Sequence, residues 1–267
     1  MSDLLASKIA VIYGGGGAIG GAAARVFARE GAKVFLAGRT QSKLATVARD
    51  IESAGGYAEV ATLDVFDENA VNAHADSVAS KAGGIDIMLN AIGIAHVQGK
   101  PFSETTLAEF EQPITSTARA QFIAAQAVAR HMVNRNRGVM LSLTTPGGRI
   151  AGKGFLANGV FSAATEAFSR LLAAELGSHG IRVICLRPDA IPDAVALSHS
   201  GEVFEGFARR LGIPVAEMLA EHGRKATLLG RLPHLAEVAE FAAFAASDRA
   251  GAMTGAIANL TCGSMVD

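Results

Sequence analysis

Residues 8–31, KIAVIYGGGGAIGGAAARVFAREG, decide the fold of this chain. The apolar, β-branched run at residues 9–13 predicts a strand that is buried on both faces. Glycines follow at once, and apolar residues then recur at helical spacing from Ile19 to Phe27. Glycine lets the backbone turn tightly beside a pyrophosphate, whose charge is stabilised by the unpaired N–H groups at the start of the helix. The stretch therefore predicts the phosphate-binding half of a dinucleotide fold; the alternative is a tight turn that binds nothing.

The composition predicts one domain, residues 1–267, with a substantial core, because 50% of the residues are hydrophobic. A formal net charge of −1 gives no electrostatic reason to expect nucleic acid or an anionic membrane as a partner. The first residues, MSDLLASK, are too short and mixed for a signal peptide, and no run reaches the roughly 18 apolar residues of a membrane span. Cys185 and Cys262 lie far apart, without metal or redox spacing. We therefore expect a cytoplasmic protein with reduced cysteines.

Apolar strands alternate with helical segments along the chain, which is typical of a parallel sheet covered on both faces. The expected strands are residues 9–13, 33–37, 57–63, 85–90, 138–143, 181–186 and 256–260. After the first helix, the expected helices are residues 41–53, 68–81, 107–130 with an interruption near Pro113, 158–178 and 236–247. Residues 191–231 are mixed and irregular, and we expect some helix within them. The sequence thus predicts an α/β fold, a Rossmann-type doubly wound parallel sheet of about seven strands with helices on both faces.

Several short motifs carry a resemblance to a known family. The turn at residues 13–20, YGGGGAIG, matches the motif TGxxxGxG, with Tyr13 in place of Thr and Ala18 in place of the middle Gly. The other motifs are DV at residues 64–65, LNAIG at 89–93 in the place of NNAG, RP at 187–188, and a C-terminal pattern at 231–233, 237–238, 246–248 and 254–255. With these motifs the chain resembles the short-chain dehydrogenase/reductase family over nearly its whole length.

The resemblance implies a nicotinamide cofactor. The implied contacts are Gly14, Gly16, Gly17, Ile19, Gly20, Arg39, Thr40, Asp64, Val65, Asn90, Gly93 and Pro188. In NAD-dependent relatives an acidic residue ends the second strand and accepts hydrogen bonds from the adenine ribose. Here that position is Gly38, and the guanidinium of the next residue, Arg39, can bind a 2′-phosphate with two hydrogen bonds. NADP(H) is therefore favoured over NAD(H), unless Arg39 is only a solvated residue at a strand end.

The catalytic residues of the resembled family are absent. Its members commonly use Tyr-x-x-x-Lys with a Ser before it and an Asn on the long helix, because a Tyr beside a Lys can give a carbonyl oxygen its proton. Alignment places the Tyr, Lys, Ser and Asn positions at Asn158, Ser162, Thr145 and Thr117. A shifted alignment cannot restore the pair, because the only tyrosines are Tyr13 and Tyr57, and no Lys lies between residues 153 and 225.

The groups that remain can still orient a substrate. The Thr145 hydroxyl and the Asn158 amide can donate hydrogen bonds to an oxygen, but neither releases a proton near neutral pH. Ser162 can reach a ribose hydroxyl. Two residues can titrate: His96, on the loop that flanks the nicotinamide in the resembled family, and Lys153, on the loop that usually lines the substrate pocket. For both, a solvated loop residue is the alternative interpretation.

Two acidic residues and one long segment bear on the same site. Asp189 replaces the Gly of the family's PG segment, and Asp193 stands where a Thr often bonds the cofactor. A carboxylate beside the nicotinamide or the pyrophosphate is unfavourable unless it points away or is paired, and Arg187 or Arg149 could neutralise one of the two. Residues 191–231 take the place of the family's substrate loop, and we expect an apolar lid; satellite core packing or a subunit contact is the alternative. The lid would be formed by Val203, Phe204, Phe207, Leu211, Ile213, Met218 and Leu219.

These observations favour an NADP(H)-dependent short-chain oxidoreductase with non-standard acid–base chemistry. Its small-molecule substrate would need little help at oxygen, as an iminium or a conjugated system does, or would take a proton from His96, Lys153 or water. The alternative is a catalytically inactive homologue that binds NADP(H) as a sensor or a structural partner; a non-redox enzyme ranks last. The resemblance also implies a homodimer or homotetramer, which the small-residue faces at residues 118–129 and 163–174 would allow.

Overall fold

A parallel sheet of seven strands, in the order β3-β2-β1-β4-β5-β6-β7, forms the centre of the computed structural model, which describes residues 3–266. Every neighbouring pair of strands is parallel. The strands are β1 (Ile9–Tyr13), β2 (Lys33–Gly38), β3 (Tyr57–Thr62), β4 (Ile87–Asn90), β5 (Gly138–Leu143), β6 (Ile181–Pro188) and β7 (Ala256–Leu260). The predicted doubly wound α/β fold is confirmed, and the strand ends differ from the expected ones by at most two residues.

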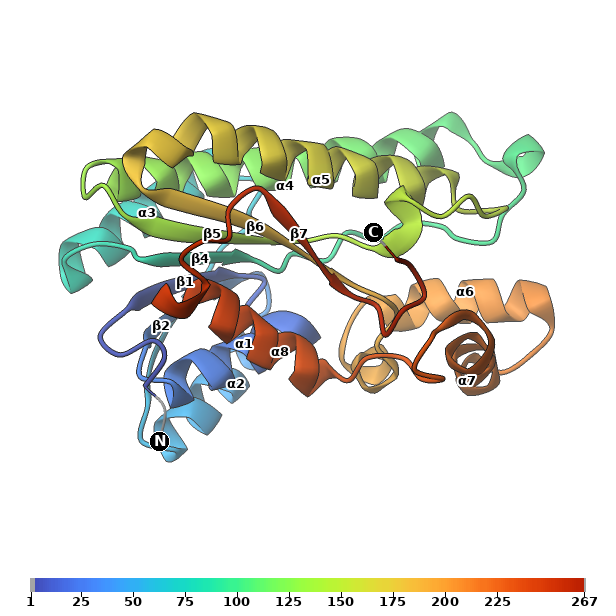
Figure 1. Ribbon diagram of the computed structural model, residues 1–267, viewed down its shortest axis with the longest axis horizontal. Coiled ribbons are helices and arrows are strands. Elements are labelled where there is room, and N and C mark those ends of the chain that lie inside the picture. Colours follow the sequence, from blue (N-terminus) through green and yellow to red (C-terminus); the bar gives the residue numbers. More distant parts are fainter. Residues whose placement is uncertain (1–2, 267) are drawn as a thin grey trace.

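Helices cover both faces of the sheet (Figure 1). One face carries α1 (Ala18–Arg29), α2 (Gln41–Ser53) and α8 (Leu235–Ala246), and the other carries α3 (Glu68–Ala82), α4 (Leu107–Val133) and α5 (Leu156–Leu176). Because side chains of a strand alternate between faces, β1 serves both halves of the core: Ala10 and Ile12 pack in one cluster, and Val11 and Tyr13 in the other. This burial on both faces is what the unbroken apolar run at residues 9–13 predicts.

The long helix α4 runs through Pro113 without a break, so the expected interruption there is wrong. A proline inside a helix removes one backbone hydrogen bond and costs about 3 kcal/mol. The following turns bury Ala120, Ala124 and Val128 against the sheet. Helices in proteins draw most of their stability from such packing, which is why one missing hydrogen bond does not end this helix.

Residues 191–231 are more regular than the sequence suggests. They contain a 3₁₀ segment (Pro192–Leu197) and two helices, α6 (Ser200–Leu211) and α7 (Val215–Ala226). Both helices lie beyond the end of the sheet, beside the carboxyl ends of the strands (Figure 1). We call residues 191–231 the cover segment. Within residues 3–266, no helix is both long enough and apolar enough to cross a membrane.

Parallel strands end at the same edge of a sheet, so the segments after β1, β2, β4, β5 and β6 meet there. The order of the strands reverses between β1 and β4, which pair directly. In open α/β sheets, ligands bind in the crevice outside this reversal point. The fold therefore brings the glycine turn, the loop after β4 and the cover segment to one place.

Candidate functional site

A cavity of about 900 Å³ lies at this edge and extends from the glycine turn after β1 to α6 and α7. Its volume falls in the range of small-molecule and cofactor sites. Of the predicted cofactor and catalytic residues, all line the cavity except Gly20 and Ser162. The residues that line it are Gly14, Gly16, Gly17, Ile19, Arg39, Thr40, Asp64, Val65, Asn90, His96, Gly93, Thr117, Thr145, Asn158 and Pro188.

The glycine turn fits a pyrophosphate. Gly14 has a φ of +80°, and a Cβ atom there would lie 2.4 Å from the Ala91 carbonyl oxygen. Helix α1 follows directly, with Gly17 as its N-cap and no side chain capping its first N–H groups. Uncapped N–H groups beside a backbone without side chains form an anion site. Gly20 lies on the side of the turn away from the cavity. A Cβ atom at this position would lie 2.3 Å from the Gly14 carbonyl oxygen, so a glycine here lets α1 pack closely against the turn.

Two basic residues line the nucleotide end of the cavity. Arg39 is exposed at the end of β2, and its side chain has no hydrogen bond or ion pair with any residue of the described chain. Lys43, in the first turn of α2, lines the cavity near Arg39 and lies beside Gly16. Sequence reasoning missed Lys43, although its place four residues after Arg39 is the signal that could have found it. The two cations are therefore available to a phosphate group.

Asn90 supports the loop after β4 from inside. It is buried, and its amide donates to the Ala120 carbonyl at 3.3 Å and to Gln121 Oε1 at 3.4 Å. Its Oδ1 accepts the Ile92 N–H at 3.3 Å. These bonds tie the loop to α4, so Asn90 shapes the cavity wall through the backbone. The next predicted contact, Gly93, faces the ring of His199 from the cover segment: a Cβ at Gly93 would lie 2.2 Å from His199 Nδ1.

Three of the predicted catalytic residues form one cluster. Thr145 lies in the turn after β5, and Asn158 and Ser162 lie one turn apart on α5. The Thr145 hydroxyl donates to Asn158 Oδ1 at 3.1 Å and is 2.8 Å from Ser162 Oγ. Ser162 is fully buried and does not line the cavity, because its hydroxyl points to Thr145. The expectation that Ser162 reaches a ribose hydroxyl is therefore wrong for this structure.

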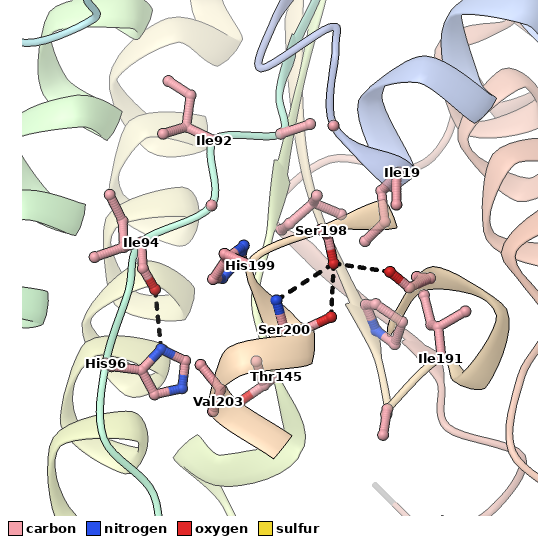
Figure 2. Close-up of a pocket in the computed structure, with 18 of the residues that line it drawn as sticks. Ile19, Ile92, Ile94, His96, Thr145, Ile191, Ser198, His199, Ser200 and Val203 are labelled. Atoms are coloured by element: carbon pink, nitrogen blue, oxygen red, sulfur yellow. Dashed lines mark hydrogen bonds between the residues drawn. The ribbon is translucent and has the colours of Figure 1, made fainter. Parts of the chain in front are cut away.

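His96 belongs to the same cluster, because its ring contacts the Asn158 amide. Figure 2 shows a second hydrogen bond of the ring, to the Ile94 carbonyl. Its Nδ1 lies 2.9 Å from the Ile94 carbonyl oxygen, and its Nε2 lies 2.9 Å from Gln98 Nε2 and 3.2 Å from Asn158 Nδ2. Burial lowers the pKa of His96, and the bond to the Ile94 carbonyl offsets only part of this effect. The ring is therefore neutral at pH 7. Since a carbonyl oxygen can only accept, the proton is assigned to Nδ1, and Nε2 accepts from the two amides.

The other two candidates differ from each other. Thr117 of α4 lines the cavity, and its hydroxyl oxygen is buried without a hydrogen-bond partner within residues 3–266. A buried hydroxyl without a partner is costly, so it favours a polar ligand atom nearby. Lys153 is exposed on the loop after β5 and does not line the cavity. The structure thus brings His96 into the cluster and leaves Lys153 outside it.

The two carboxylates of concern are both paired, but not with the expected arginines. Asp189 accepts hydrogen bonds from His222 Nε2 at 3.1 Å, from Ala190 N at 2.7 Å and from Ser264. Burial pushes the pKa of Asp189 up, but the bonds from His222 and Ser264 outweigh it and leave that pKa below its usual range.

Asp193 accepts the Leu235 N–H at 3.0 Å, at the start of α8, where a helix stabilises negative charge. Arg187 and Arg149 bond Glu166 instead, at 3.1 Å and 3.3 Å. The expectation that these arginines neutralise Asp189 or Asp193 is therefore wrong. Asp189 thus faces the His222 ring, and Asp193 is exposed and does not line the cavity, which reduces the charge conflict that the sequence suggests.

The cover segment gives the cavity an apolar wall. All of the expected lid residues line it: Val203, Phe204, Phe207, Leu211, Ile213, Met218 and Leu219. Met218 and Leu219 also belong to a small core cluster within the segment. Two contacts join α6 to the opposite wall: the Phe207 ring packs edge-on against Phe155 at 5.4 Å, and Arg210 donates to the Gln98 carbonyl at 2.9 Å. The substrate side of the cavity is thus largely apolar, and the charged side chains that the cover segment adds to it, Glu221 and Lys225, pair with each other.

Comparison with known proteins places this geometry among oxidoreductases. The family model described as enoyl-(acyl carrier protein) reductase matches residues 16–264. The chain is 35% identical to the uncharacterized oxidoreductase YuxG of Bacillus subtilis, over 93% of this chain and 36% of that protein, so it spans about a third of this relative. It is 30% identical to (+)-cis,trans-nepetalactol synthase of Nepeta racemosa, over 96% of this chain and 90% of that protein.

Two solved structures have the same fold. A short-chain type dehydrogenase/reductase from Mycobacterium marinum superposes with a TM-score of 0.83 at 26% identity, covering 100% of both chains. A 7α-hydroxysteroid dehydrogenase complexed with NADH and 7-oxo glycochenodeoxycholic acid superposes with a TM-score of 0.82 at 27% identity, covering 98% of this chain and 96% of the other. The relatives with solved complexes thus include a protein that binds a nicotinamide cofactor.

Proposed function

The chain belongs to the short-chain dehydrogenase/reductase family of oxidoreductases, and we propose that it uses NADP(H) to reduce or oxidise a small, uncharged organic substrate. One observation carries the proposal: a single cavity joins the glycine turn and the unpaired Arg39 to the hydroxyl and amide of Thr145 and Asn158. A cofactor on the turn would extend along the cavity towards this cluster. A nicotinamide cofactor supplies or accepts a hydride when it is bound.

NADP(H) is proposed over NAD(H) because the end of β2 is basic. Gly38 offers no carboxylate to a ribose hydroxyl, and Arg39 and Lys43 line the cavity directly after it. A guanidinium matches a phosphate with two parallel hydrogen bonds, whereas a plain ribose would leave it unused. The basic pair therefore favours the 2′-phosphate.

On the substrate side, this chain positions and polarises an oxygen atom. Asn158 has one amide N–H on His96 Nε2, and its second N–H has no partner within the described residues. We assign that N–H to the substrate oxygen. Thr145 orients the amide from its other end, because its hydroxyl donates to Asn158 Oδ1. Neither group releases a proton near neutral pH, and His96 presents an acceptor, so the residues of this cluster act without a general acid.

The charged residues around the cavity narrow the range of substrate classes further. Its acidic lining residues within the described chain are Asp64, Asp189 and Glu221. Asp64 lies at the adenine end, Asp189 is paired with His222, and Glu221 is paired with Lys225. A cationic iminium would therefore find no free carboxylate, and burying an unpaired charge is costly. A conjugated carbonyl compound suits the cluster better, because hydride added at its β-carbon gives an enolate that a hydrogen bond at oxygen stabilises and that takes its proton from water.

A non-catalytic NADP(H)-binding protein is the alternative. It is supported by the loss of all four family catalytic residues and by the burial of Ser162 in the Lys position. A sensor or structural partner would keep the cofactor site and need no proton donor. The two proposals share the nucleotide and differ in turnover.

The test begins with nucleotide binding. NADPH and NADH are titrated by nicotinamide fluorescence into the wild type, Arg39→Ala and Arg249→Ala, the last being an exposed arginine far from the cavity. We expect tighter binding of NADPH, a loss of about 10- to 100-fold in Arg39→Ala and none in Arg249→Ala, since hydrogen bonds between charged groups contribute about 1.5–3 kcal/mol. Equal, unaffected binding of both nucleotides would contradict the NADP(H) assignment.

Turnover then separates the two proposals. NADPH oxidation is followed with panels of enones, saturated carbonyls and imines, and activity with enones is the expected result. Binding of NADPH without oxidation across the whole panel would favour the inactive homologue. The double variant Asn158→Tyr, Ser162→Lys restores the Tyr and Lys of the family. If the wild type turns over a substrate and the double variant loses that activity, the inactive alternative is refuted.

We also propose a cytoplasmic homo-oligomer. Cys185 and Cys262 are both free within the described chain. Large apolar side chains are exposed on the outer helices, with exposed fractions of 55% for Phe122 on α4 and 69% for Leu171 on α5. Such faces suit a contact with a second copy. Analytical ultracentrifugation that detects only monomers would contradict this part of the proposal.

A further inference from the structure

Gln98 joins the catalytic cluster to the cover segment. It lies on the loop after β4 and is 8% exposed. Its side-chain Nε2 is 2.9 Å from His96 Nε2, and its backbone carbonyl accepts Arg210 of α6 at 2.9 Å. One residue therefore contacts both the ring that bonds Asn158 and the helix that closes the cavity.

In the hydrogen bonds that lead from Thr145 to the Ile94 carbonyl, each group donates to the next one. The Ile94 carbonyl accepts the proton of His96 Nδ1, which leaves His96 Nε2 as an acceptor. Asn158 must then present its NH₂ group to His96 and its Oδ1 to the Thr145 hydroxyl, which donates to it. Reversing the amide of Asn158 would place two acceptors against each other at Nε2. The tautomer of His96 thus decides which end of the Asn158 amide faces the ring.

Gln98 supplies a second N–H to the same ring nitrogen. Because an amide N–H donates, it stabilises the His96 ring when Nε2 carries no proton. A carboxylate in its place would accept, and would stabilise the ring when Nε2 is protonated or the ring is charged. Two further rings face His96. The Phe161 ring is edge-on at 5.0 Å and carries no charge. The pKa of His199, from the cover segment, is lowered by burial, which favours the neutral form of that ring as well. Gln98 therefore acts in the same direction as burial and the Ile94 carbonyl, which also favour a neutral ring with its proton on Nδ1.

We propose that Gln98 is a positioning residue that keeps His96 in its acceptor tautomer and so orients the Asn158 amide for substrate, and that Arg210 links this arrangement to closure of α6 over the cavity. The substrate part of this inference rests on the proposed function. The tautomer part concerns the chain alone. The position of α6 and the aim of the amide are then linked, because the same loop carries both contacts.

The tautomer is tested by long-range ¹H–¹⁵N NMR of the histidine rings, without nucleotide, with His96 assigned by a His96→Asn variant. In the wild type we expect Nδ1 protonated and Nε2 unprotonated from about pH 6 to about pH 8. Gln98→Glu should raise the pKa of His96 by about one unit or more, because an opposite charge at this distance favours the ionised ring. Gln126→Glu adds the same charge on the exposed face of α4 and should change nothing.

Two neutral variants test the positioning role without adding charge. Gln98→Leu removes the donor at similar volume and should let the Nε2–H tautomer appear; Arg210→Met should move the same His96 signals, and Arg209→Met, one residue away and without a side-chain bond, should not. With an active substrate, Gln98→Leu should lower kcat about tenfold and leave the Kd for NADPH unchanged.

The outcomes separate this inference from the proposed function. His96 protonated on Nε2 in the wild type, or signals of His96 that do not change in Gln98→Leu and Gln98→Glu, would overturn the role of Gln98. Unchanged signals in Arg210→Met would overturn the link to α6. If NADPH failed to bind while all His96 results held, the proposed function would be refuted and the hydrogen-bond arrangement would stand.

Discussion

The amide nitrogen of Asn158 lies 3.2 Å from Nε2 of His96, although the two residues are 62 positions apart. Asn158 stands where this family commonly has its catalytic Tyr, and His96 stands on the loop after β4. In the function proposed above, a neutral ring that accepts and an amide that donates take the place of the proton donor. The proposed role of this pair is to bind and polarise an oxygen atom.

Removing the amide should abolish polarisation. In Asn158→Leu we expect kcat to fall by about 100-fold, the scale of one lost donor to a developing oxyanion, because the side chain keeps its branched shape and loses its N–H groups. The Kd for NADPH, measured by fluorescence, should not change. Asn158→Ser retains a donor and should recover part of kcat. Full activity in Asn158→Leu would show that the oxygen is bound elsewhere.

Gly38→Asp should reverse the nucleotide preference. A Cβ at residue 38 would meet only Leu44 Cδ2 at 3.6 Å, an ordinary contact, so the substitution is tolerated. Its carboxylate would repel a 2′-phosphate and accept hydrogen bonds from the ribose hydroxyls of NADH. We expect NADPH binding to weaken by about tenfold or more, and NADH binding to strengthen. Gly38→Ala is the steric control, and the same loss of NADPH binding there would contradict the charge argument.

Gly147→Ala should displace the Asn158 amide. A Cβ at residue 147 would lie 1.8 Å from Asn158 Oδ1, so one of the two must move. Overpacking of this kind costs about 1–3 kcal/mol in the free energy of unfolding, measured by urea denaturation. Gly177→Ala, at a helical position with nothing within 4 Å, should instead stabilise by about 0.4–1 kcal/mol. Loss of stability in both variants would indicate a general effect of replacing glycine.

The His222–Asp189 pair should make stability depend on pH. The hydrogen bond to Asp189 raises the pKa of His222, so its contribution is complete below the unfolded pKa of about 6.5 and is lost as pH rises through the folded value. The pKa of Asp189 is lowered, so its contribution is present above the unfolded value of about 3.9 and is lost as pH falls through the folded one. The pair should therefore stabilise most between about pH 4 and about pH 6.5.

His222→Gln measures this effect. Because the His222 side chain is 36% exposed, we expect a difference of only about 0.5 kcal/mol in the free energy of unfolding near pH 5, shrinking at higher pH. Urea denaturation of both proteins across this range gives the two curves. A constant difference at every pH would show that His222 contributes by packing, without its charge.

Part of the site could be predicted from local patterns. The glycine turn, Arg39 after β2 and the residues in the four catalytic positions all follow from spacing along one strand or helix, and most of them line one cavity. The apolar lid residues were also predicted, from the place that residues 191–231 take in the resembled family, and all of them line the cavity. The sequence analysis missed Lys43, although it lies only four residues after Arg39, and it missed two partners from distant segments: Gln98 on His96 and His222 on Asp189.

By itself, the sequence determined the doubly wound sheet, the glycine turn after its first strand and the absence of a Tyr–Lys pair, because periodicity and residue identity are local properties of a chain. Only the tertiary structure decided that Ser162 points away from the cavity, that Asp189 faces His222 and Ser264, and that His96 accepts from Asn158. Side-chain directions and loop paths depend on packing between segments far apart in sequence. The chemistry of this site depends on those contacts.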